Sequence, residues 1–253
     1  IGEDYDLAHP DVVDYAIERG WHKKGESFHF AKSYSDFLYT KFSGSQERRS
    51  CANDILAQQI GKITHLTMMA ILQSHEEESD LPPIHHFSVK SVCMHAGFLY
   101  GDHATGSYCI SLKKGEPLVG WVTGSSTPCI SLFKPFTLFE DPLSYIWAEN
   151  DDEALNFWLK GEYIHRRLMN ATIAFLQQYE EERKQVQEEI ISLYKQKQFH
   201  KAWEKENEFV KKYDELLVDY DRAVHAGNFY FKRYWSKRNK KLYHNHPKFF
   251  MER

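Results

Sequence analysis

The stretch that decides the fold reads VKSVCMHAGFLYGDHATGSYCISLKKGEPLVGWVTGSSTPCISLFKPF and spans residues 89–136. Short runs rich in Val, Ile, Phe, Tyr and Trp alternate in it with Gly, Pro and Ser, a pattern typical of strands joined by turns. Because the connections are short, we expect one antiparallel sheet. The predicted strands are SVCMHAG (91–97), GSYCISL (106–112), LVGWVTG (118–124) and PCISLFKPF (128–136).

Helical patterns flank this sheet on both sides. Before it, residues 28–42, 47–60 and 64–75 are predicted helices, and Thr64 is a suitable N-cap for the last one. After it, residues 151–198 read as one long helix, bent near Gly161. Residues 200–225 form a second helix, with apolar positions seven residues apart. This spacing predicts a long antiparallel helical hairpin packed like a coiled coil.

Several motifs in order along the chain are similar to those of a known family. They are CMHAG (93–97), ATGSY (104–108) and VTGSSTPCISLFKPF (122–136), together with HPDVVDYAIERGWHKKGESFHFAKSYSD (9–36) and GKITHLTMMAILQSH (61–75). The chain resembles the secernin-like branch of the cysteine dipeptidases, which belong to the N-terminal-nucleophile hydrolases. The resemblance covers about residues 1–180. It implies an α+β fold in which residues 1–145 form the C-terminal part of an αββα sandwich and residues 146–253 form a helical extension.

The resemblance also implies a reaction. In this family a cysteine at the mature N-terminus attacks an amide carbonyl, and its own α-amine is the base. Ile1 carries no nucleophile, so the expected partner is an N-terminal segment that supplies the cysteine, and no catalytic residue is expected within the chain. The expected activity is hydrolysis of small peptides or other amides. Two alternatives stay open: a non-catalytic interaction protein of the same fold, and an acyltransferase of the same superfamily.

Polar residues at the ends of the predicted strands are candidates for substrate binding. Hydroxyl and imidazole groups there could bind the carboxylate or amide of a dipeptide through fixed hydrogen bonds. The chain has Ala104 before Thr105, where family members often have two threonines, so one hydroxyl is lost. The predicted substrate-binding residues are His95, Thr105, Ser107, Ser126 and Thr127.

The cysteines and the remaining histidines suggest no cofactor. Cys93 lies two residues from His95, which fits either a thiolate–imidazole pair or a buried thiol beside a satisfied histidine. We favour the second interpretation, because no third orienting group is apparent. Cys109 and Cys129 fall in apolar runs and are assigned to the core. His244 and His246, like the adjacent His85 and His86, lack further ligands at zinc-site spacing. We therefore predict no metal site.

Composition limits the remaining choices. The chain has 253 residues, a net charge of −4 and four cysteines. The cysteines lack the spacing of a disulfide framework, so a reducing, cytoplasmic location is the expectation. No apolar run approaches the ~20 residues that span a bilayer. Residues 229–253 carry eight Lys or Arg against Glu252, which fits a packed basic helix better than a nucleic-acid surface. Homo-oligomerisation through the hairpin stays open.

Overall fold

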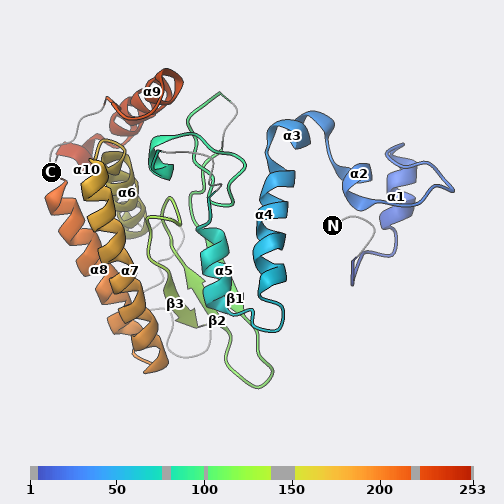
Figure 1. The fold of residues 1–253 in the computed structure, drawn as a ribbon, viewed down its shortest axis with the longest axis horizontal. Helices are drawn as coiled ribbons and strands as arrows, with labels where there is room; N and C mark the ends of the chain where they lie inside the picture. Colours follow the sequence, from blue (N-terminus) through green and yellow to red (C-terminus); the bar gives the residue numbers. More distant parts are fainter. Residues whose placement is uncertain (1–4, 76–80, 100–101, 138–151, 218–222, 252–253) are drawn as a thin grey trace.

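The computed structural model describes residues 5–75, 81–99, 102–137, 152–217 and 223–251. These residues form a mixed fold in which helices surround a small antiparallel sheet (Figure 1). The α+β class and the antiparallel sheet are thus confirmed. The predicted boundary at residues 145 and 146 lies outside the described ranges. No helix in the described ranges is long and apolar enough to cross a membrane.

The sheet has the strand order β1-β2-β3, with β1 at Tyr108–Ser111, β2 at Val119–Val122 and β3 at Lys134–Thr137. In the register, Cys109 pairs with Trp121, and Trp121 pairs with Pro135. Trp121 is fully buried and stacks on His65, the first residue of α5. The sheet therefore rests on α5 at its β1 side.

Two predicted strands differ from the structure. Residues 91–97 form only an isolated bridge, between Ser88 and His95, because the Cys93 N–H instead donates to the Ser74 carbonyl at 3.1 Å. Residues 128–136 begin as a turn, in which the N–H groups of Ile130 and Ser131 both donate to the Thr127 carbonyl at 3.1 Å. Only the end of that run becomes strand β3.

The helices before the sheet are α1 (Val12–Glu18), α2 (Phe30–Tyr34), α3 (Phe37–Phe42), α4 (Ser45–Gln58) and α5 (His65–Leu72). The cap at Thr64 is confirmed, since its hydroxyl accepts the Thr67 N–H at 3.4 Å within a capping box. The single helix predicted over residues 28–42 is wrong. Ser35 is extended there, and Asp36 starts a second helix by accepting the Tyr39 N–H at 2.9 Å.

The helices after the sheet are α6 (Asp152–Leu168), α7 (Ile173–Lys195), α8 (Phe199–Leu216), α9 (Phe229–Asn245) and α10 (Pro247–Met251). Gly161 lies inside α6, and the bend predicted near it stays a prediction. The single helix predicted over 151–198 is wrong. The chain breaks instead where Thr172 caps α7 by accepting the Phe175 N–H at 3.2 Å. Helices α7 and α8 lie side by side, joined by residues 196–198 (Figure 1).

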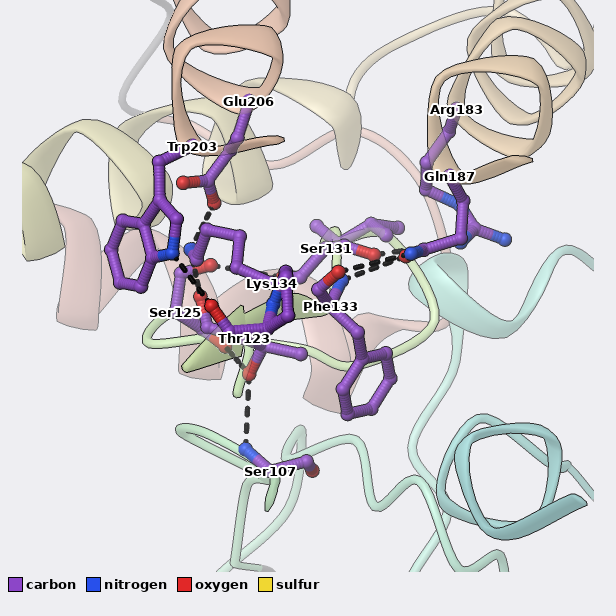
Figure 2. A network of polar contacts seen from close by, with 12 residues as sticks. Ser107, Thr123, Ser125, Ser131, Phe133, Lys134, Arg183, Gln187, Trp203 and Glu206 are labelled. Atoms are coloured by element: carbon purple, nitrogen blue, oxygen red, sulfur yellow. Dashed lines mark hydrogen bonds and ion pairs between the residues drawn. The ribbon is translucent and has the colours of Figure 1, made fainter. Parts of the chain in front are cut away.

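The α7–α8 hairpin covers the sheet, and Figure 2 shows the polar contacts between the hairpin and the sheet. The Trp203 indole N–H on α8 donates to the Pro135 carbonyl at 2.8 Å. Glu206 forms a buried ion pair with Lys134, whose ammonium also donates to the Thr123 carbonyl at 2.8 Å. These contacts place the end of the sheet, and the turn before β3, against the hairpin.

Candidate metal centre

Four side chains that could bind a metal converge beside the sheet: His75, Cys93, His95 and Cys129. One ligand atom from each lies within 4.8 Å of the other three. They come from three separate segments. His75 follows the end of α5, Cys93 and His95 flank the bridge at Ser88, and Cys129 lies in the turn before β3.

The three ligand separations that involve His95 Nε2 match those of a tetrahedral site. The Nε2 atoms of His75 and His95 are 3.1 Å apart. The Cys93 and Cys129 sulfurs lie 3.6 and 3.5 Å from His95 Nε2. Zinc bonds of ~2.0–2.1 Å to nitrogen and ~2.3 Å to sulfur give tetrahedral edges of about 3.4 Å between nitrogens and about 3.6 Å between nitrogen and sulfur. All three measured separations lie within about 0.3 Å of these edges.

Hydrogen bonding alone does not account for the arrangement. His95 Nε2 faces three groups at once: His75 Nε2, Cys93 Sγ and Cys129 Sγ. A ring nitrogen carries either one hydrogen or one lone pair, so it can form only one normal hydrogen bond in this direction. Four donor atoms directed toward a common point are instead what a cation requires.

Backbone and side-chain contacts hold the three segments in place. The Cys93 N–H donates to the Ser74 carbonyl, which fixes Cys93 beside the residue that precedes His75. His95 and Ser88 exchange backbone hydrogen bonds of 2.9 and 3.0 Å. Gln73, just after α5, donates from its side chain to the Pro128 carbonyl at 2.9 Å. These bonds tie the exit of α5 both to the loop of Cys93 and to the turn of Cys129.

The turn that carries Cys129 is also anchored to the hairpin. Tyr179 on α7 donates its hydroxyl to the Ile130 carbonyl at 2.8 Å. The side-chain amide of Gln187 accepts the Phe133 N–H at 2.7 Å and donates to the Phe133 carbonyl at 3.0 Å, as a neighbouring strand would (Figure 2). Arg183 donates to the Ser131 carbonyl at 3.4 Å. The site thus lies where α5, the sheet and the hairpin meet.

The electrostatics of the two thiols differ. A hydrogen bond from Cys93, followed by the nearby His95 and His75 imidazoles, lowers the pKa of Cys129 well below its ordinary value. Burial, and then the contact with Cys129, raise the pKa of Cys93. Thr127 adds an outer contact, with its hydroxyl 3.2 Å from the Cys129 sulfur. The Cys129 thiolate is therefore the more accessible anion, and a bound cation would favour ionisation of both thiols.

The ligand types indicate which metal fits. Two thiolates and two imidazoles suit Zn²⁺, and four protein ligands make a closed coordination shell of the structural kind. Hard cations such as Mg²⁺ and Ca²⁺ prefer oxygen ligands, which this set lacks.

The predicted substrate-binding residues do not form one open surface. His95 belongs to the four-residue cluster, and Thr127 contacts Cys129. Ser126 and Thr127 are buried, whereas Thr105 is exposed. Ser107 is half-buried and donates its backbone N–H to the Thr123 hydroxyl at 3.0 Å. Their role in substrate binding stays a prediction.

The sequence analysis missed this cluster as a metal site. Only Cys93 and His95, two residues apart, gave a local signal, and they do come together as anticipated. His75 lies 20 residues from His95, and Cys129 lies 34 residues from it. These separations match no short zinc motif, and the apolar run around Cys129 pointed to the core.

Away from this centre, the described residues form a groove of about 800 Å³ between α2 and α4. None of the predicted site residues lines it. No protein-family model matches the chain and no solved structure matches it, so function is inferred from its own residues.

Proposed function

We propose that this chain is a zinc-binding protein, with one Zn²⁺ held by His75, Cys93, His95 and Cys129. The observation that carries the proposal is the convergence of two thiols and one imidazole on His95 Nε2 at the edge lengths of a tetrahedral site. With four protein ligands and no open position, the ion would be structural rather than catalytic.

Such an ion would cross-link three segments that are distant in sequence. It would tie the exit of α5 to the loop around Cys93 and to the turn before β3. These segments already share backbone contacts, including Cys93 with Ser74 and Gln73 with Pro128. Zinc would add its binding free energy to the folded state, because the unfolded chain has no preformed site.

Cobalt substitution tests this proposal directly. Co²⁺ bound to two thiolates shows sulfur-to-metal charge-transfer absorption, which a site without sulfur ligands lacks. We expect the wild-type chain to show this band at the first equivalent of Co²⁺, and Zn²⁺ to displace it. Cys129→Ser and Cys93→Ser should each weaken the band. Cys51→Ser is the matched control, because Cys51 is also a free cysteine but lies outside the ligand set.

The result that would overturn the proposal is a wild-type chain that binds no Co²⁺ through sulfur. A band of undiminished strength in both the Cys93→Ser and the Cys129→Ser variant would overturn it as well. Alkylation gives a second readout: bound Zn²⁺ should protect Cys93 and Cys129 but leave the labelling of Cys51 unchanged. Equal labelling of Cys93 and Cys129 with and without Zn²⁺ would count against the site.

A second proposed function is the one that the family resemblance implies. In this proposal the chain is the C-terminal part of a secernin-like cysteine dipeptidase or amidohydrolase of αββα fold, with its nucleophile on an N-terminal segment. An acyltransferase and a non-catalytic interaction protein of this fold remain the alternatives. Neither Cys93 nor Cys129 would be the nucleophile, since both would be metal ligands.

The observation that favours this second proposal is the exposure of β1. Tyr108 and Ile110 in β1 are 70% and 47% exposed, and Leu112 just after it is 78% exposed. Strand β1 is also one of the two outer strands, so one of its edges has no strand partner in the described parts of the chain. An apolar outer strand of this kind is suited to pairing with further β-structure.

A thiol-directed amide probe tests the second proposal on native material. If the natural protein carries an N-terminal cysteine segment, we expect the probe to label its first residue and small peptides to compete. An intact segment that stays unlabelled would favour the interaction protein. Labelling that is removed by Cys51→Ser would contradict an N-terminal nucleophile.

A further inference from the structure

A second group of metal-ligating side chains lies beside the first: His103, Glu162 and His165. One ligand atom from each lies within 4.8 Å of the other two. Glu162 and His165 are three residues apart on α6, which places both side chains on one face of that helix. His103 comes from the segment before β1 and brings its ring to 4.6 Å from that of His165, measured between centroids.

Every member of this trio has a buried polar atom with no hydrogen-bond partner in the described part of the chain. These atoms are His103 Nε2, Glu162 Oε1, and both ring nitrogens of His165. Each such atom costs about 1–3 kcal/mol when it is left unpaired away from water. Glu162 and His165 are almost fully buried, so solvent contact does not relieve the cost.

Neighbouring groups already contact the other polar atoms of His103 and Glu162. His103 Nδ1 lies 3.4 Å from the Ala96 N–H. In a metal-bound ring Nδ1 would carry the hydrogen and give up this long contact, and Nε2 would supply the lone pair. The Oε2 atom of Glu162 accepts from Arg166 Nε at 3.1 Å and Nη2 at 2.9 Å, which leaves Oε1 free. Arg166 in turn donates to Asn239 on α9 at 2.9 Å. Outer contacts of this kind orient the ligands of natural metal sites.

We propose that His103, Glu162 and His165 bind a divalent transition-metal ion at a second site, distinct from the one at Cys93 and Cys129. Two imidazoles and one carboxylate are the protein ligands of open zinc sites, and they also suit Fe²⁺. Three ligands leave at least one coordination position free. The two sites would be neighbours, because the His95 and His103 ring centroids are 6.1 Å apart.

Stoichiometric titration with Co²⁺ and Zn²⁺ tests the second site. We expect the wild-type chain to bind two equivalents of Co²⁺, the first with and the second without a sulfur charge-transfer band. Glu162→Gln keeps the side-chain shape, and His103→Asn keeps an acceptor for the Ala96 N–H. Each should lower the stoichiometry to one equivalent and leave the sulfur band intact. His85→Asn is the matched control, since His85 is another buried histidine with an unpartnered Nε2 outside both clusters.

The outcomes separate this inference from the first zinc site. Cys129→Ser should weaken the sulfur band and still leave the equivalent bound by the trio. A wild-type chain that saturates at one equivalent would overturn the second site, and so would folded Glu162→Gln and His103→Asn variants that still bind two. If Glu162→Gln does not fold, His103→Asn decides the question, because His103 lies on a loop and is only half-buried.

Discussion

At the residue scale, buried histidines dominate the chemistry of this chain. His65 stacks on Trp121 with ring centroids 5.1 Å apart and planes 5° from parallel. Burial, then Lys113 and Lys195, lower the pKa of His65. The folded protein therefore holds this ring in its neutral form at a pH where the unfolded chain protonates it.

The first prediction concerns the pH dependence of stability. Below about pH 6.5, His65 is protonated in the unfolded chain but stays neutral in the folded chain. The free energy of unfolding therefore falls as the pH falls. One such group contributes a slope of at most about 1.4 kcal/mol per pH unit. His65→Phe keeps the stacking and removes the titration. Urea unfolding with chelator present measures the free energy of unfolding between about pH 7.5 and 5.5. We expect this free energy to fall less with decreasing pH in the variant than in the wild-type chain. Parallel curves for the two proteins would contradict the assignment.

The sequence predicted no metal site, and it singled out only one pair among the four proposed ligands. The pairing of Cys93 with His95 follows from their spacing, and the structure brings them to 3.6 Å. His75 and Cys129 join the site only because α5 and the turn before β3 pack against each other. No local sequence pattern predicts this packing. The hydrogen bonds from Cys93 to Ser74 and from Gln73 to Pro128 hold these segments together, and they join parts that are far apart in the sequence.

At the element scale, the hairpin and the sheet are joined by the buried pair of Lys134 and Glu206. The Lys134 ammonium also lies 4.7 Å from the Phe157 ring centroid and 5.1 Å from that of Trp203. A buried ion pair is costly to break from one side, because the remaining charge has no partner. The stabilising effect of the ion pair is therefore seen in the free energies of unfolding of variants that lack one partner at a time.

The second prediction follows from this asymmetry. Lys134→Met and Glu206→Leu should each destabilise the fold by about 3–5 kcal/mol, since each strands one buried charge. The double variant should be much less destabilised than the sum of the two single variants. Guanidinium unfolding of the four proteins measures the coupling. Single variants within about 1 kcal/mol of wild type would show that the pair is not buried as described.

A third prediction concerns Gly161 inside α6. Alanine in place of an exposed helical glycine usually stabilises a helix by about 1 kcal/mol. Here an added Cβ would lie 2.6 Å from the Cβ of Ser125. Gly161→Ala should therefore destabilise the protein by about 1–3 kcal/mol, and adding Ser125→Gly should recover part of the loss. Thermal melting measures both changes, and a more stable single variant would contradict the close packing.

Elements with a strong local signal were predicted well, and the errors have physical causes. The capping hydroxyl of Thr64 defines the start of α5 correctly. The strand prediction at 91–97 was wrong because the Cys93 backbone N–H donates to the Ser74 carbonyl rather than to a neighbouring strand. Gly161 does not end a helix, and its close approach to Ser125 shows that a glycine inside a helix can also allow close packing.

At the scale of the whole molecule, the proposed zinc ion joins parts that the sequence analysis treated separately. The predicted helical extension packs on the sheet through Trp203 and Glu206 (Figure 2). It also anchors the turn of Cys129 through Tyr179. Metal binding would therefore couple α5, the sheet and the hairpin into one cooperative unit.

The fourth prediction is that metal removal destabilises the entire chain. With free Zn²⁺ at a thousand times its dissociation constant, binding adds about 4 kcal/mol to the free energy of unfolding. For a chain of this size that corresponds to roughly 10 °C in melting temperature. Calorimetry with and without chelator measures the shift. It should be smaller in Cys129→Ser, which keeps only the second proposed site, and persist in full in Cys51→Ser, whereas an equal shift in both variants would point to unspecific metal effects.

X-ray absorption at the zinc edge tests the central claim most directly, on protein loaded with one equivalent of Zn²⁺. We predict a four-coordinate ion with two sulfur neighbours at about 2.3 Å and two nitrogen neighbours at about 2.0–2.1 Å. A first shell made only of oxygen and nitrogen, or an ion surrounded by water, would contradict a zinc site at His75, Cys93, His95 and Cys129.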